Sequence, residues 1–226
     1  MKTNRRWLVA NAHDGAGVER MSLSPDHFNY DEQVRPEPAE GQVLIRSLYF
    51  ATDPMNHAWV RGVPGRFEAI PVGEPMRGGV AGVVVASRHP DFHEGDQLTG
   101  FLDWCDFNLC TGHDRLGEKL QVIPPDIAIV HGLSALGMTG ICAWLSVCDF
   151  GATQPGDTVM VSGASGAIGS LAGQVAKIAG AKVIGTARGE EKCRFVSGLG
   201  FDQVPAAALG QFTAANFGRK LICVGS

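Results

Sequence analysis

The sequence lacks the features that mark membrane-spanning and secreted proteins. No run approaches the roughly 18 apolar residues that a membrane span requires. The apolar residues near the N-terminus stop at Asn11, short of the roughly 7–15 that a secretory signal needs. The six cysteines form no Cys-x-x-Cys pair, and their scatter favours reduced thiols over a disulfide framework. We therefore expect a cytoplasmic protein with no membrane partner.

Charge is also scarce. Charged residues make up 19% of the chain and the formal net charge is −4, so non-specific nucleic-acid binding has no electrostatic driving force. We expect no nucleic-acid partner. Glycine, in contrast, is abundant at 30 of 226 residues, which predicts many tight turns and close backbone approaches. The length fits one large domain or two small ones.

Residues 1–130 have the pattern of a β-rich domain. Val43–Phe50 and Gly78–Ala86 are strand-like runs, and glycines in the second predict a bulge or close packing. Short strands separated by Gly and Pro turns predict a small barrel or sandwich.

From about Gly132 the pattern changes to alternating helices and strands. The expected elements are a helix over 133–147, a strand over 158–162, a helix over 168–178, a strand over 181–187 and a helix over 190–199. This order is typical of a parallel sheet with crossover helices. The fold class predicted is α/β plus β, with domains at 1–130 and 131–226.

A glycine-rich loop joins the first strand of the second region to the helix that follows. Its glycines are spaced Gly163-x-x-Gly166-x-x-Gly169, which departs from the strict dinucleotide spacing. Backbone N–H groups and the helix dipole at such a turn can hold a pyrophosphate. We take Ser165, Gly166, Ala167, Ile168 and Gly169 as candidate cofactor ligands. The alternative is an ordinary tight turn between strand and helix.

The end of the next strand indicates which dinucleotide is bound. Enzymes that use NAD usually carry an acid there for the ribose hydroxyl, but this strand ends in Ala187-Arg188. Arg188 and Lys192 offer positive charge for the extra phosphate of NADP. Glu190 and Glu191 argue the other way, because either could bind a hydroxyl, and all four could simply be solvated at a helix start. We favour NADP.

Several segments, in this order, resemble the zinc-independent medium-chain dehydrogenase/reductases, in the subgroup of prostaglandin reductase, leukotriene B4 dehydrogenase and curcumin reductase. They are 7–10, 49–54, 72–79, 137–140, 166–169, 191–194 and 199–202. The resemblance implies a GroES-like N-terminal domain, a Rossmann-type domain and reduction of the C=C bond of α,β-unsaturated aldehydes or ketones with NADPH.

The resemblance also implies roles for single residues. Residues 166–169 match the pyrophosphate loop, and Lys192 matches the lysine that binds the 2′-phosphate. Met138 and Thr139 match a segment beside the cofactor, and Cys223 lies in a run that resembles the entry into a late Rossmann strand. Tyr49 and Thr52 are candidate catalytic hydrogen-bond donors to the substrate. A small enone or alkenal is the expected partner, and family dimers that join Rossmann edge strands make a homodimer an option.

The sequence departs from this family at three places. Met55 stands where many members have a tyrosine, and a thioether cannot donate a proton. A segment present in the family after Asp202 is missing, and the chain stops at Ser226, so we expect a truncated Rossmann-type parallel sheet. The handedness rule permits a crossover helix at 206–215, with 220–224 pairing beside the first strand of that sheet.

The zinc-binding residues of related dehydrogenases are also missing. Gly73-Glu74 lacks the histidine of their Gly-His-Glu motif. Cys105, Cys110 and His113 could bind a metal in principle, but residues 104–110 have the pattern of a strand. We expect no metal site. The function predicted is an NADPH-dependent enone or alkenal reductase; a catalytically impaired dinucleotide-binding protein and a truncated remnant of the family are the alternatives.

Overall fold

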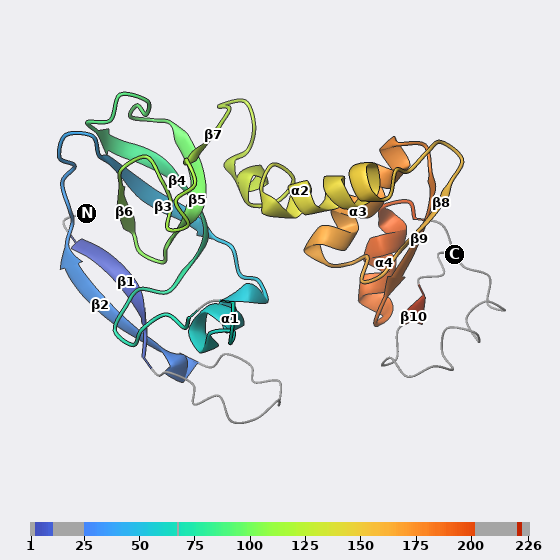
Figure 1. Ribbon diagram of the computed structural model, residues 1–226, viewed down its shortest axis with the longest axis horizontal. Coiled ribbons are helices and arrows are strands. Elements are labelled where there is room, and N and C mark those ends of the chain that lie inside the picture. The colour runs from blue at the N-terminus through green and yellow to red at the C-terminus, as the bar shows by residue number, and fades with distance from the viewer. Residues whose placement is uncertain (1–2, 11–24, 67, 202–220, 223–226) are drawn as a thin grey trace. The chain divides into compact units, whose positions relative to one another are not determined.

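The computed structural model describes residues 3–10, 25–66, 68–201 and 221–222 (Figure 1). The chain divides into two compact units, Met1–Leu133 and Ser134–Ser226. Each unit has its own sheet and its own buried apolar cluster, so each is described by itself.

The first unit is built from antiparallel strands. Its main sheet has the strand order β6-β3-β4-β5-β7, and a separate hairpin pairs β1 with β2. The strands are β1 (Thr3–Val9), β2 (Phe28–Val34), β3 (Val43–Phe50), β4 (Arg77–Ser87), β5 (Gln97–Asp103), β6 (Phe107–Cys110) and β7 (Gln121–Ile123). The helices are α1 (Met55–Arg61) and two 3₁₀ turns, Pro25–His27 and Ile129–Leu133. The β-rich N-terminal region predicted from the sequence is confirmed.

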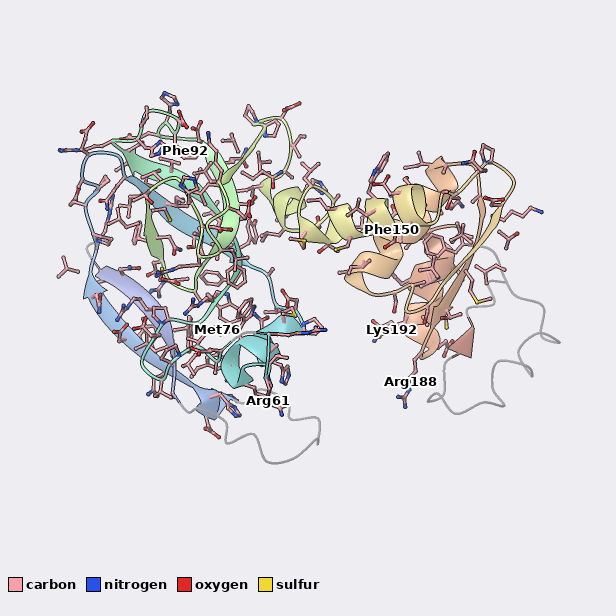
Figure 2. The ribbon with its side chains drawn as sticks, viewed as in Figure 1. Arg61, Met76, Phe92, Phe150, Arg188 and Lys192 are labelled. Carbon is pink, nitrogen blue, oxygen red and sulfur yellow. The ribbon has the colours of Figure 1, made fainter. Side chains whose placement is uncertain are left out.

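Two apolar clusters hold this unit together. One lies under the five-stranded sheet and includes Phe92, and the other packs α1 and β1 around Met76 (Figure 2). Trp104, on the connection between β5 and β6, packs partly buried against both clusters. A side chain at Gly82 would begin 2.4 Å from the Arg46 carbonyl oxygen. The expected close packing at the β4 glycines is therefore confirmed, and β3 shifts register against β4 on either side of that contact.

The second unit contains a strand–helix–strand arrangement. β8 (Thr158–Val161) lies parallel to β9 (Lys182–Ala187), and α3 (Ala167–Ile178) connects them. The other elements are α2 (Met138–Trp144), a π-helical turn at Leu145–Phe150, α4 (Glu190–Gly198) and β10 (Leu221–Ile222). Small residues such as Ala164, Ala172 and Ala176 form much of the buried cluster, so the α3 backbone packs close to the sheet.

The helix expected over 133–147 is wrong at both ends. Its α-helical part begins only at Met138, because Gly137 is extended and the Ser134 carbonyl accepts the N–H groups of Gly137 and Gly140 in a turn. At the other end the helix continues as a π turn to Phe150, where the Gly151 N–H donates to the Ser146 carbonyl at 3.0 Å.

The expected strand at 220–224 is also placed differently. Leu221 and Ile222 pair antiparallel with Thr186 and Ala187 of β9 rather than beside β8. The edge of β9 that β8 leaves open can be paired by an antiparallel strand without any crossover connection. The predicted helix at 206–215 lies outside the described residues.

Candidate functional site

The glycine loop between β8 and α3 has the geometry of an anion site. Its backbone turns at Gly163, whose φ of +64° favours glycine. The Ala164 N–H donates to the Thr186 carbonyl of β9 at 2.8 Å, and the Gly166 N–H donates to the Gly163 carbonyl at 2.8 Å. These bonds fix the loop at the carboxyl ends of two parallel strands, where ligands bind in open α/β sheets.

The start of α3 leaves its first amides available. Gly166 is the N-cap and supplies no side-chain cap, and the first amide that bonds back to it is that of Ser170, at 2.9 Å. The N–H groups of Ala167, Ile168 and Gly169 precede that bond and have no acceptor within the helix. Gly166, Ala167 and Ile168 are exposed and Ser165 is half-buried. The candidate loop residues therefore present uncapped amides at the positive end of a helix dipole.

Two cationic side chains lie just after the carboxyl end of β9. Arg188 follows β9 directly and is exposed, and Lys192 lies in the first turn of α4 and is also exposed. Figure 2 shows both side chains extending outward from the unit near the end of β9. Glu190 and Glu191 occupy the same first turn of α4 and are exposed as well. The two cations and the two acids that could select between NADP and NAD therefore all follow the carboxyl end of β9.

Met138 and Thr139 are the first two residues of α2, which packs against α3. Met138 is 72% exposed, so this methionine is not part of the core. Cys223 lies outside the described residues.

The two candidate donors of the first unit have different surroundings. Thr52 lies just before α1 and lines a hollow of about 630 Å³. Tyr49 is half exposed on β3 and is not among the lining residues of that hollow. The hollow is lined by Phe28, Thr52, Asp53, Pro54, Asn56, His57 and Trp104. Thr52 alone of the pair therefore faces a space that could take a small molecule.

The sequence did not point to Asn56 or Trp104, two residues that line this hollow and carry buried polar nitrogens. Asn56 is 4% exposed and the indole nitrogen of Trp104 is buried. The two residues are far apart in the chain, and only the packing of α1 against the β5–β6 connection brings them to one place. The one available signal in the sequence was a polar Asn56 two residues after Pro54, at a position on the buried face of α1. A spacing rule alone would accept an apolar side chain there equally well, so this signal was weak.

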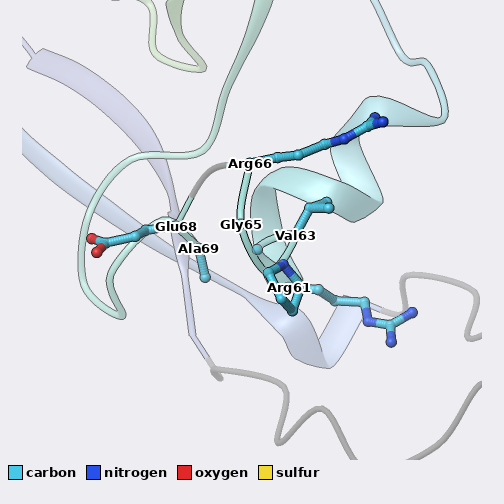
Figure 3. A pocket seen from close by; sticks show the side chains of 8 residues that line it. Arg61, Val63, Gly65, Arg66, Glu68 and Ala69 are labelled. Atoms are coloured by element: carbon cyan, nitrogen blue, oxygen red, sulfur yellow. The ribbon is translucent and has the colours of Figure 1, made fainter.

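A second hollow lies at the end of α1, and its charged lining residues do not point toward a common centre. It is lined by residues of the turn after the helix, including Arg61, Arg66 and Glu68. Figure 3 shows the Arg61 and Arg66 side chains leading away from one another. The described residues of this turn therefore do not bring the two arginines together.

Cys105 is a buried thiol and Cys110 a half-buried one. Burial raises the pKa of each thiol to about 12, and the Cys105 thiol donates to the Phe107 carbonyl at 3.1 Å. His113 is exposed and contacts the Thr111 carbonyl at 3.2 Å. Within the described residues, no three His, Cys, Asp or Glu side chains are grouped so that they could hold a metal ion. In the same part of the chain, no helix has the length and apolar character needed to cross a bilayer.

Comparison with known proteins places this geometry in a family. Residues 5–116 match a family model described as the N-terminal domain of oxidoreductase. The chain is 36% identical over 202 residues to the NADPH-dependent curcumin reductase of Escherichia coli, covering 88% of this chain and 55% of that protein. It is 33% identical over 177 residues to mouse prostaglandin reductase 1, covering 78% of this chain and 51% of that protein.

A solved structure agrees with these matches. The structure of CurA from Vibrio vulnificus in complex with NADPH superimposes with a TM-score of 0.76 at 30% identity, covering 92% of this chain and 60% of that one. The chain spans about half the length of the curated relatives that it matches. It belongs to the zinc-independent medium-chain dehydrogenase/reductases, in the subgroup of the curcumin and prostaglandin reductases.

Proposed function

We propose that this protein is an NADPH-dependent oxidoreductase that reduces the C=C bond of α,β-unsaturated ketones or aldehydes. The observation that carries the proposal is the uncapped start of α3, with the amides of Ala167, Ile168 and Gly169, together with the exposed cations Arg188 and Lys192 that follow β9. Relatives named as NADPH-dependent curcumin reductase and NADP-dependent alkenal reductase support the same chemistry. A truncated Rossmann-type unit, a cytoplasmic location and a homodimer belong to this proposal as predictions.

The second unit fits a dinucleotide in its details. Gly166 carries no side chain where a pyrophosphate would approach, and the nearest atom to a Cβ built there is the Gly163 carbonyl oxygen at 3.2 Å. The loop amides would hold the pyrophosphate, and Arg188 and Lys192 would hold the 2′-phosphate. When bound, NADPH supplies a hydride to the β-carbon of the substrate.

The first unit would orient the substrate. Thr52 lies at the hollow with a hydroxyl that can donate to a carbonyl oxygen, and the aromatic rings of Phe28 and Trp104 provide apolar walls for a conjugated system. A donor at the carbonyl oxygen stabilises the negative charge that develops there as hydride adds to the β-carbon. A proton must then reach the α-carbon.

The test is NADPH consumption in the presence of benzalacetone, a small conjugated ketone. Enone-dependent consumption that yields the saturated ketone is the expected result. The absence of turnover at high protein concentration, with NADPH binding intact, would favour an impaired dinucleotide-binding protein instead. That alternative is motivated by Met55, whose half-exposed thioether cannot replace the tyrosine of many relatives. A chain that shows neither NADPH binding nor a cooperative melt would not be stably folded by itself.

A further inference from the structure

Four buried side-chain N–H donors of the first unit have no hydrogen-bond partner within the part of the chain that the structure describes: Arg35 Nε, Asn56 Nδ2, Arg77 Nε and Trp104 Nε1. Of these residues, Asn56 and Trp104 also line the hollow beside α1. Leaving a buried donor unsatisfied is costly, so native proteins rarely do so without a ligand, a water or a function at that point.

Both donors lie close to Gly78 of β4. A Cβ built on Gly78 would stand 3.0 Å from Trp104 Nε1 and 3.3 Å from Asn56 Nδ2. The packing therefore brings together two N–H donors from separate elements, α1 and the β5–β6 connection. Because both contacts are tighter than ordinary van der Waals contact, a side chain at position 78 would press on both N–H groups.

The orientation of each donor is fixed by a separate interaction. Asn56 Oδ1 accepts the Asp53 N–H at 2.7 Å, and this bond assigns the NH₂ group to the other end of the amide, beside Gly78. The Trp104 ring stacks on Phe50, with ring centroids 5.7 Å apart, and on Phe28, with centroids 6.3 Å apart. Donors held in this way are organised before a ligand arrives.

The surrounding hollow selects the kind of acceptor. Asn56 and Trp104 line it together with Phe28, whose ring lies nearly parallel to the indole at 23°. Asp53 also lines it, and its carboxylate repels an anionic ligand. Two neutral donors, aromatic walls and a nearby carboxylate together favour an uncharged, planar, conjugated carbonyl compound.

We propose that Asn56 and Trp104 form a two-donor site for the carbonyl oxygen of the enone or enal. This inference rests on the proposed function and adds the residues that hold the reacting carbonyl. When hydride adds to the β-carbon, the electron pair of the C=C bond forms a new double bond to the carbonyl carbon, and the carbonyl pair moves to oxygen. Both N–H groups donate to that oxygen, and a proton from water then adds to the α-carbon.

Binding to the intact wild-type protein tests the site without turnover. The probes are benzylacetone, a saturated ketone that cannot be reduced at a C=C bond, and butylbenzene, which lacks the oxygen. In ¹⁵N-resolved NMR spectra we expect benzylacetone to move the Trp104 indole N–H and Asn56 NH₂ signals downfield. Butylbenzene should not produce this shift, because it offers no acceptor.

Variants provide the second measurement. Trp104→Phe keeps an aromatic ring and removes the donor, and Asn56→Asp keeps the acceptor for Asp53 and removes the NH₂ group. Each should weaken benzylacetone binding about tenfold and lower kcat/KM for benzalacetone about 100-fold, the scale found for one oxyanion donor. Trp7→Phe is the matched control, because its indole is 46% exposed on β1, and we expect it to change neither quantity.

The outcomes separate this inference from the proposed function. A ketone-specific shift of the two N–H signals in a protein without turnover would support the site and count against the reductase activity. Normal turnover with unchanged kinetics in folded Trp104→Phe would overturn the site and leave the reductase proposal standing. If Asn56→Asp fails to fold, the wild-type spectra still decide, and equal shifts with ketone and hydrocarbon would refute the site.

Discussion

The Gly163 carbonyl oxygen lies where a side chain on Gly169 would begin. A Cβ built on Gly169 would stand 2.5 Å from that oxygen and 3.0 Å from the Ala164 Cα. The first turn of α3 thus packs directly on the loop that precedes it, and both contacts are with backbone, which cannot rotate away. The loop and the start of the helix form one rigid unit, and this keeps the amides of Ala167 and Ile168 in position.

Gly169→Ala should therefore weaken NADPH binding by tenfold or more and lower the melting temperature, because the loop must move off the helix. Thermal shift with and without NADPH measures both effects. Gly198→Ala is the control, since a Cβ there meets nothing within 4 Å and alanine favours a helix. We expect that variant to match or slightly exceed the wild type. Equal NADPH affinity in both variants would contradict the proposed role of the loop.

Arg188→Ala and Lys192→Ala should each lower NADPH affinity about tenfold and leave NADH affinity unchanged, because only NADPH carries the 2′-phosphate. Titration of each variant with both dinucleotides measures the selectivity. Lys182→Ala is the control, since Lys182 is exposed at the opposite end of β9.

Variants of the two acidic residues in the first turn of α4 test whether the protein selects NAD instead of NADP. If Glu190→Gln or Glu191→Gln lowers NADH affinity while the two cation variants leave NADPH affinity intact, the protein selects NAD, and the interpretation of Arg188 and Lys192 is wrong.

The glycine loop could be predicted because its determinants are contiguous in the sequence. A short apolar strand, the turn at Gly163 and the apolar spacing of α3 all lie within residues 158–178, so local rules suffice. The same rules failed at residues 133–137, where an apolar run concealed a turn that Ser134 stabilises through its carbonyl. They also failed at β10, which pairs with β9 instead of β8. Contacts between residues far apart in the sequence decide the sheet edge with which a strand pairs, and local rules do not include such contacts.

The donor pair in the first unit could not be predicted for the same reason. Asn56, Gly78 and Trp104 come from three elements, and no spacing rule links them. Their common feature, two N–H groups without acceptors beside a glycine, exists only once the chain is folded.

Loss of the Arg6–Asp31 ion pair should destabilise the β1–β2 hairpin. Arg6 donates to both carboxylate oxygens of Asp31, at 2.9 and 2.6 Å, and these hydrogen bonds lower the pKa of Asp31 below its ordinary 3.8. Because the folded-state pKa is depressed, the stabilisation is fully present above the unfolded-state value and is lost as pH falls through the folded-state value. Asp31→Asn should cost about 0.5–1 kcal/mol at neutral pH, and the difference from wild type should shrink below about pH 4.

Chemical denaturation at several pH values measures this effect. Asp126→Asn, which changes an exposed acid of the same unit, is the control and should follow the wild type. A constant difference between Asp31→Asn and wild type from neutral to strongly acidic pH would rule out the ion pair as its cause.

Cys105 and Cys110 should resist alkylation while the protein is folded. Burial raises the pKa of both thiols to about 12, and Cys105 is only 5% exposed, so at pH 8 roughly one molecule in ten thousand carries the reactive thiolate at either position. Peptide mapping after a short treatment with iodoacetamide should find both unmodified, and the same treatment in guanidinium should label both. Rapid labelling of Cys105 in native buffer would mean that the β5–β6 connection opens readily, and Trp104 on that connection could not then present a preorganised donor.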